Sequence, residues 1–136
     1  MSVGDKLDAK KEAFLEKADP QKISEYEQGI LDVEKSGVLE RAKNVGDKAP
    51  DFTLADSTGE NVTLSTLLET GPVVMIWYRG EWCPYCNIYL ADIQNHSDAF
   101  KEAGAHIVAI SPETPEHAVS ITDKLALGYT VLSDVK

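Results

Sequence analysis

Positive charge is scarce in this chain. Of its 136 residues, 13 are Lys or Arg and 23 are Asp or Glu, which gives a formal net charge of −10. A surface this negative repels phosphate groups. The composition therefore excludes nucleic acid and anionic membrane surfaces as expected partners.

Cysteine and long apolar segments are scarce as well. The two cysteines, Cys83 and Cys86, are too few for the disulfide framework of a small secreted domain. The longest apolar run, Val73–Tyr78, is too short to span a bilayer, and the N-terminus lacks the apolar stretch of a signal peptide. We therefore expect a cytoplasmic protein, in which a close cysteine pair is catalytic or metal-binding.

The first part of the chain has the pattern of two helices. Residues 2–19 are predicted to form one helix, and Asp19 followed by Pro20 is a start signal for a second. Gly37 fits the position just after the end of the second helix. The apolar spacing of three and four predicts that the second helix buries Ile23, Tyr26, Ile30 and Val33.

Residues 44–50 have the composition of a linker, so we place a boundary there, between a helical extension (1–45) and a domain (46–136). The domain begins with a predicted β-hairpin, in which short alternating strands flank the turn at residues 56–59. A short helix, which Ser65 can cap, is expected to follow the hairpin.

From residue 73 the pattern alternates between strands and helices. Val73–Tyr78 is apolar without alternation, which is typical of a strand covered on both faces. After it we expect a helix over 83–103 and then a strand over 106–110. A further helix, capped by Thr114 with Pro115 at its first position, is expected to end near Gly128, and a last strand follows over 129–132. Right-handed crossovers make these three strands parallel, with helices on both faces, so the fold class is α/β.

The two cysteines stand at the predicted turn from the apolar strand into the next helix. Open α/β sheets place their sites at this end of a strand, and the first helical turn points unpaired N–H groups toward the sulfurs. Sulfurs at i and i+3 also lie close enough for a disulfide. The pattern favours redox chemistry over an inert cysteine pair and over half of a zinc site. A zinc site needs four ligands, and the candidates for the other two are histidines that we expect at the surface or half-buried: His96, His106 and His117.

The charged residues beside the cysteines act in opposite directions on the thiols. A helix N-terminus contributes roughly 0.3–1 kcal/mol to an exposed charge and up to ~2 kcal/mol to a partly buried one, and one pKa unit is about 1.4 kcal/mol. A strongly acidic thiol therefore needs a cation as well. Arg79, one of only two arginines, stands four residues before Cys83 and is our candidate. Glu81 raises the thiol pKa unless its side chain turns to solvent or pairs with Arg79.

Several segments resemble a known family. Gly46-Asp-Lys-Ala-Pro-Asp-Phe-Thr-Leu54 resembles the opening segment of peroxiredoxins, the alkyl hydroperoxide reductase/thiol-specific antioxidant superfamily. Tyr78-Arg-Gly-Glu-Trp-Cys-Pro-Tyr-Cys86 is similar to the active-site loop of its Cys-x-x-Cys branch, and Val108–Ser111 and Val131–Asp134 are similar to its next two strand ends. The resemblance implies a thioredoxin-like fold and reduction of hydrogen peroxide or organic hydroperoxides through a dithiol/disulfide cycle. It implies no metal or organic cofactor, and a thioredoxin-like or small-thiol reductant.

The resemblance also implies roles for residues. On the family pattern Pro-x-x-x-Thr-x-x-Cys, the peroxidatic cysteine falls on Cys86, whereas in thioredoxins the first cysteine of the pair, Cys83, is the nucleophile. Which sulfur attacks first is therefore open, and we expect attack by Cys86, resolution by Cys83 and stabilisation of the thiolate by Arg79. The expected pocket walls are Tyr78, Trp82, Pro84 and Tyr85.

On the family pattern the Pro falls on Arg79 and the Thr on Cys83, so this chain departs from the family at both positions, and it departs in two further ways. No arginine follows Arg79, and the chain stops at Lys136, where family members continue, so we expect the C-terminal part of the fold to be missing. The strand at 73–78 would then have a bare edge, which promotes association. We expect a second copy to pair with it in a homo-oligomer, or the N-terminal helices to hide it.

Two other functions stay open on the sequence. One is a thioredoxin-like thiol–disulfide oxidoreductase, in which Cys83 attacks a protein disulfide and Cys86 resolves it. The other is a truncated, catalytically poor interaction module that keeps the cysteine loop but lacks its supporting half. Disulfide reduction without peroxide dependence distinguishes the first of these from a peroxidase, and an active longer chain beside an inert short one would identify the second.

Overall fold

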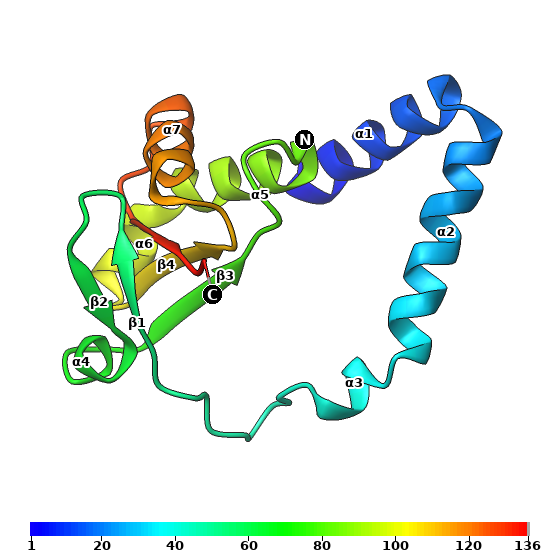
Figure 1. Ribbon diagram of the computed structural model, residues 1–136. Helices are drawn as coiled ribbons and strands as arrows, with labels where there is room; N and C mark the ends of the chain where they lie inside the picture. Colours follow the sequence, from blue (N-terminus) through cyan, green and yellow to red (C-terminus); the bar gives the residue numbers. More distant parts are fainter. Residues whose placement is uncertain (136) are drawn as a thin grey trace. The chain divides into compact units, whose positions relative to one another are not determined.

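A computed structural model describes residues 1–135 of the chain (Figure 1). These residues form two compact units. One unit comprises residues 8–50, and the other comprises Met1–Leu7 together with the chain from Asp51 onward. The second unit contains the β-sheet and both cysteines. None of the helices within 1–135 is long and apolar enough to cross a bilayer.

Both predicted N-terminal helices are confirmed, and so are the start and end signals of the second. The Asp19 carboxylate accepts the backbone N–H of Gln21 at 2.8 Å, and Pro20 occupies the first helical position. Gly37 follows the second helix with φ 73°, a left-handed conformation that glycine adopts at little cost. The helices of this part are Val3–Lys17 (α1), Pro20–Lys35 (α2) and the single turn Val38–Arg41 (α3).

The predicted burial of α2 is wrong. Ile23 is half-buried, but the side chains of Tyr26, Ile30 and Val33 are 55%, 62% and 56% exposed. A unit as small as residues 8–50 has too little chain to enclose a row of apolar side chains. The Tyr26 ring has one aromatic neighbour, Phe14, at 5.8 Å between ring centroids.

The sheet of the second unit has the strand order β2-β1-β5-β4-β3. The predicted hairpin is confirmed: β1 pairs antiparallel with β2, with Leu54 opposite Val62. The three later strands are parallel, as predicted, and β1 joins them by antiparallel pairing with β5. The strands are Thr53–Asp56 (β1), Asn61–Thr63 (β2), Val73–Trp77 (β3), His106–Ser111 (β4) and Thr130–Ser133 (β5).

The helix predicted over 83–103 is two helices, Pro84–Asn95 (α5) and Ser97–Glu102 (α6). They separate at His96, whose φ and ψ of −109° and 4° are not helical. Its ring nitrogen Nδ1 lies 2.8 Å from the Asp92 carbonyl oxygen. In a continuous helix this carbonyl would accept the backbone N–H of His96. A side-chain contact with the backbone therefore accompanies the break.

The short helix after the hairpin is Leu64–Leu68 (α4), and its predicted cap is wrong. The cap position is Thr63, while Ser65 is already inside the helix. The Asp51 carboxylate instead accepts the Ser65 N–H at 2.9 Å and the Ser65 hydroxyl at 2.6 Å. The last helix, Pro115–Leu125 (α7), begins as predicted, with Thr114 at the cap position and Pro115 first.

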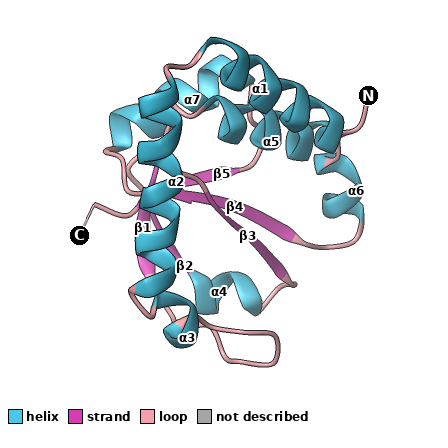
Figure 2. Ribbon diagram, turned by 90° about the vertical axis from the view of Figure 1, so that its right-hand side faces the viewer, coloured by secondary structure: helices cyan, strands magenta, loops and turns pink. Residues whose placement is uncertain are grey.

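Both crossover connections lie on one face of the sheet. Side chains of α5 and α7, such as Leu90 and Ile121, pack there with β3, β4 and β5, and Figure 2 shows both helices on the same side of the strands. On the other face, Val108, Ile110 and Leu132 pack against the hairpin and against Leu67 of α4. The prediction that the crossover helices cover both faces is therefore wrong. Strands β3, β4 and β5 are added in one direction across the sheet, so right-handed crossovers all lie on one face, and the hairpin and one turn of α4 cover the other.

Within residues 1–135, strand β3 lies at the edge of the sheet, as predicted, with β4 as its one neighbour. The prediction that it is covered on both faces is wrong at its carboxyl end, where Trp77 is 65% exposed. Trp77 is the last residue of the strand and belongs to neither of the two apolar clusters that cover the sheet. The carboxyl ends of the three parallel strands meet at this end of the sheet, where the loop with the cysteines begins.

Candidate active site at the cysteine turn

The loop from β3 to α5 brings the two cysteines to the start of a helix. The Tyr78 N–H donates to the Ile110 carbonyl at 3.0 Å, which extends the sheet pairing one residue past β3. The chain then turns, and the Cys83 N–H donates to the Gly80 carbonyl at 3.1 Å. Cys83 is the N-cap of α5, and Cys86 lies in the first turn, as the sequence predicted.

The two sulfurs are 2.7 Å apart and both cysteines are free thiols. Three donors converge on the Cys83 Sγ: the Cys86 thiol, the Cys86 backbone N–H at 3.3 Å and the Arg79 guanidinium at 3.3 Å. A sulfur that accepts three hydrogen bonds, one of them from a cation, is set up to hold a negative charge. The structure thus brings together all three predicted catalytic side chains.

Burial and hydrogen bonding divide the two thiols. Burial by itself raises the pKa of Cys83, but the hydrogen bonds from Cys86 and Arg79 outweigh it and hold that pKa below its ordinary value. Burial and the hydrogen bond that its thiol donates to Cys83 raise the pKa of Cys86. Cys83 is fully buried and Cys86 is half-buried, so the more acidic sulfur is the less accessible one.

Arg79 is fixed by contacts on two sides. Its hydrogen bond to Cys83 raises the pKa of the guanidinium above its ordinary value. The guanidinium carbon also lies 5.0 Å from the ring centroid of Trp82, in a cation–π contact. The Trp82 ring itself is 65% exposed.

The other predicted pocket residues surround the turn at different depths. Tyr78 is buried, and this burial raises the pKa of its hydroxyl. The nearby Glu113 and Cys86 raise this pKa further, while contact with Ser111 lowers it. Pro84 is exposed at the first position of α5, and Tyr85 is half-buried. Whether they form the wall of a substrate pocket stays a prediction.

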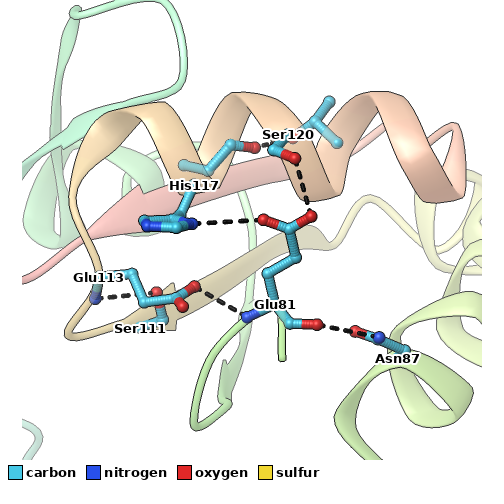
Figure 3. Close-up of polar contacts among 8 residues, drawn as sticks. Glu81, Asn87, Ser111, Glu113, His117 and Ser120 are labelled. Carbon is cyan, nitrogen blue, oxygen red and sulfur yellow. Dashed lines mark hydrogen bonds and ion pairs between the residues drawn. The ribbon is translucent and has the colours of Figure 1, made fainter. Parts of the chain in front are cut away.

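Glu81 does neither of the two things that the sequence suggested, since it turns neither to free solvent nor to Arg79. Its carboxylate accepts the Ser120 hydroxyl at 2.8 Å and lies 3.3 Å from the His117 Nδ1, both on α7 (Figure 3). Its backbone N–H donates to the Glu113 carboxylate at 2.8 Å, and its carbonyl accepts the Asn87 amide at 3.0 Å. The carboxylate is therefore held on α7.

Sequence reasoning missed most partners of Glu81. Glu113 and Ser120 lie 32 and 39 residues further along the chain, and no local pattern links such distant positions. His117 was considered only as a zinc ligand. Within residues 1–135, no group of three or more His, Cys, Asp or Glu side chains could hold a metal ion. His96 and His117 are exposed and His106 is half-buried, as expected.

Gly80 is required by the space around the loop. A Cβ at this position would overlap the Trp82 indole and lie 2.6 Å from the Glu113 carboxylate. The Trp82 ring contacts the Arg79 guanidinium, and the Glu113 carboxylate accepts the Glu81 N–H. Any larger residue would have to push one of them away.

Comparison with known proteins identifies the family. The model of the AhpC/TSA family matches residues 45–136 of this chain. The chain belongs to the AhpC/TSA family. Its AhpC/TSA segment is 34% identical over 89 residues to "Peroxiredoxin Bcp" of Escherichia coli and 36% identical over 89 residues to "Peroxiredoxin Q, chloroplastic" of Gentiana triflora, in each case over 65% of this chain. The chain spans 56% of the length of the first relative and 41% of the second.

Solved structures agree with this family assignment. The crystal structure of peroxidoxin BcpB from Mycobacterium tuberculosis is similar to this AhpC/TSA chain with a TM-score of 0.66 and 31% identity, over 69% of this chain and 61% of that one. The solution structure of a candidate protein disulfide isomerase from Bacteroides thetaiotaomicron is similar with a TM-score of 0.58 and 25% identity, over 67% of this chain and 58% of that one. The predicted fold, thioredoxin-like in its peroxiredoxin form, is confirmed.

Proposed function

We propose that the protein is a thiol-dependent peroxidase that reduces hydrogen peroxide or organic hydroperoxides through a dithiol/disulfide cycle of Cys83 and Cys86. The observation that carries the proposal is the pair itself: free sulfurs 2.7 Å apart, one accepting three hydrogen bonds, in a chain of the AhpC/TSA family. Thiolates are the sulfur species that attack peroxides, and a second thiol at this distance is placed to resolve the product.

The two sulfurs take different roles because charge and accessibility are separated. In our proposal Cys86, the half-buried sulfur, attacks the O–O bond of a hydroperoxide and takes the terminal OH as a sulfenic acid. Its proton passes across the short contact to the Cys83 thiolate and from there to the departing alkoxide, which leaves as the alcohol. Arg79 stabilises the negative charge that develops on oxygen.

The second half of the cycle closes the disulfide. The Cys83 thiolate attacks the sulfenic sulfur of Cys86, which releases hydroxide and forms the S–S bond. A reduced thioredoxin-like protein or a small thiol then supplies two electrons and restores the dithiol. Because each turnover needs such a reductant, we propose a cytoplasmic location, where thiols are kept reduced, and cell fractionation would check it.

A second candidate function is thiol–disulfide exchange, and a specific observation favours it. The pKa of Cys83, the first cysteine of the pair, is the lowered one, which suits attack of this sulfur on a disulfide. The similar Bacteroides structure is described as a candidate protein disulfide isomerase. In this alternative Cys83 attacks a protein disulfide and Cys86 resolves the mixed disulfide, and peroxide has no part.

Direct reaction of the reduced protein with peroxide separates these functions. Addition of hydrogen peroxide or an organic hydroperoxide is expected to consume both thiols and lower the intact mass by two hydrogens. An organic hydroperoxide then yields one equivalent each of alcohol and water, and hydrogen peroxide yields two equivalents of water. The variant with both cysteines replaced by serine is the control. Reduction of insulin disulfides without reaction with peroxide would favour thiol exchange, and a protein inert in both assays would favour an interaction module.

The free edge of β3 supports a further part of the proposal, a homo-oligomer in which this edge pairs with a second copy. Strand Val73–Trp77 has β4 on one side, and its apolar side chains contribute to the cores of both faces. Unpaired apolar edges of this kind favour strand addition. Sedimentation is expected to give a mass above that of one chain. A folded monomer with fast amide exchange along 73–77 would contradict the proposal.

A further inference from the structure

The active-site loop is fastened to α7 at one residue, Glu81. Every polar group of this residue has a partner: its carboxylate on α7, its N–H on Glu113 and its carbonyl on Asn87 (Figure 3). The partners come from α5, from the loop after β4 and from α7. A residue bonded at four points to three other segments is a fixed point of the loop.

Glu81 occupies the position in the chain where such a fixed point matters most. It lies midway between Arg79 and Cys83, whose sulfur accepts the hydrogen bond of the guanidinium. The contact between these two residues is a single hydrogen bond of 3.3 Å from an exposed guanidinium. Besides the contact of the guanidinium with Trp82, this hydrogen bond depends on the shape of the short loop, because an exposed arginine side chain has much conformational freedom to lose.

The charge of Glu81 makes its direction as important as its anchoring. A carboxylate this close to Arg79 could form a bidentate ion pair with the guanidinium and take it from the sulfur. The structure prevents this competition, because the Ser120 hydroxyl and the His117 ring engage both carboxylate oxygens. Hydrogen bonds from Ser120 and His117 also lower the pKa of Glu81, so the carboxylate stays charged and bound to α7.

We propose that Glu81 is a positioning residue: through Ser120 and His117 it ties the loop to α7 and keeps its own carboxylate away from Arg79, so that the guanidinium stays on the Cys83 sulfur. The proposal rests on the proposed function only in taking the Cys83 thiolate as part of the active site. It assigns a purpose to a contact between the active-site loop and α7, about 40 residues further along the chain.

The test is the pH dependence of thiolate ultraviolet absorbance, which needs no reagent to reach the buried Cys83. The double variant Ser120→Ala with His117→Ala frees the carboxylate, and Glu81→Ala removes the tie. In both, the midpoint of the first thiolate step is expected to move to higher pH by about half a pH unit or more, roughly a threefold change in the ionisation equilibrium. Glu81→Gln keeps an acceptor for Ser120 and is expected to recover most of the wild-type midpoint.

Glu116→Gln is the matched control, because this exposed carboxylate is on α7 next to His117 and has no hydrogen bond to Glu81. It is expected to leave the midpoint unchanged. Circular dichroism checks that each variant is folded. If Glu81→Ala does not fold, the double variant, which changes only two exposed side chains, tests the proposal by itself. A wild-type midpoint in the folded double variant would overturn the proposal.

Turnover with peroxide, measured on the same proteins, keeps this proposal separate from the proposed function. A wild-type protein that does not react with peroxide, while the double variant still shifts the thiolate midpoint, would overturn the peroxidase and leave Glu81 as a positioning residue. If the wild type turns over peroxide and the midpoint does not move in the double variant, the peroxidase is supported and the positioning role of Glu81 is overturned.

Discussion

Cys86→Ser is expected to abolish peroxide consumption, while Cys83→Ser leaves a slow reaction that stops at the sulfenic acid. Cys86 is the accessible sulfur of the pair, so its loss removes the attacking atom. Loss of Cys83 removes both the acceptor for the Cys86 proton and the resolving thiol. We expect turnover to fall by about a hundredfold or more in either variant, as for the loss of a catalytic acid–base group.

The two variants differ in what accumulates, and this difference identifies the attacking sulfur. In Cys83→Ser, one equivalent of peroxide is expected to convert Cys86 to a sulfenic acid that a dimedone-type reagent captures. In Cys86→Ser, the same reagent is expected to find nothing on Cys83. Capture on Cys83 alone would assign the attack to the first cysteine, in the manner of a thiol–disulfide oxidoreductase.

Arg79→Met is expected to slow thiol alkylation and peroxide reduction at neutral pH by about tenfold, because a cation at this distance favours the thiolate. The guanidinium is the one cationic donor among the three hydrogen bonds to Cys83. The pKa of Cys83 is lowered in the native protein, so its thiolate forms as the pH rises through a value below the ordinary thiol range. Without Arg79 this step moves to higher pH, and high pH is expected to restore much of the lost rate.

The second arginine of the chain provides the matched control. Arg41 lies in α3, within the unit of residues 8–50, and donates to the Ser36 carbonyl, so Arg41→Met removes the same charge and changes no residue of the cysteine turn. It is expected to leave the pH profile unchanged. Arg79→Lys is expected to recover part of the rate, because an ammonium supplies the charge but lacks the planar group that stacks on Trp82. Equal profiles for Arg79→Met and Arg41→Met would contradict the assigned role.

Local signals in the sequence predicted the frame of the site. Asp19-Pro20 and Thr114-Pro115 begin helices where the capping rules place them, and the apolar run at 73–77 forms a strand that leads into the cysteine turn. The spacing of Cys83 and Cys86, with Arg79 one helical turn before them, was enough to bring the three side chains together. These features depend on neighbours in the chain, which a sequence displays directly.

Features that depend on distant contacts could not be predicted. The break at His96 involves a side chain that lies against a backbone carbonyl, in a segment whose pattern continues the helix. The direction of Glu81 is decided by Ser120 and His117, which become its neighbours only when α7 packs beside the loop. The exposure of α2 reflects how little chain surrounds it, although its spacing is that of a buried face.

Separation of charge from accessibility is the physical basis of the proposed mechanism. A thiol that is both acidic and exposed is open to any oxidant, whereas in our proposal the charge is on the buried Cys83, whose pKa is lowered, and the proton is on the half-buried Cys86. The short contact lets one proton serve both sulfurs in turn. The cycle then needs only the two thiols, Arg79 and an external reductant.

The most direct test of this account is a pH titration of thiolate ultraviolet absorbance in the wild-type protein, Cys86→Ser and Cys83→Ser. The account predicts that the first thiolate of the wild type forms at a pH below the range of a free thiol. This step is expected to remain in Cys86→Ser, because the serine hydroxyl can replace the thiol as hydrogen-bond donor, and to be lost in Cys83→Ser. Persistence of the low step in Cys83→Ser, or an ordinary thiol titration in all three proteins, would contradict it.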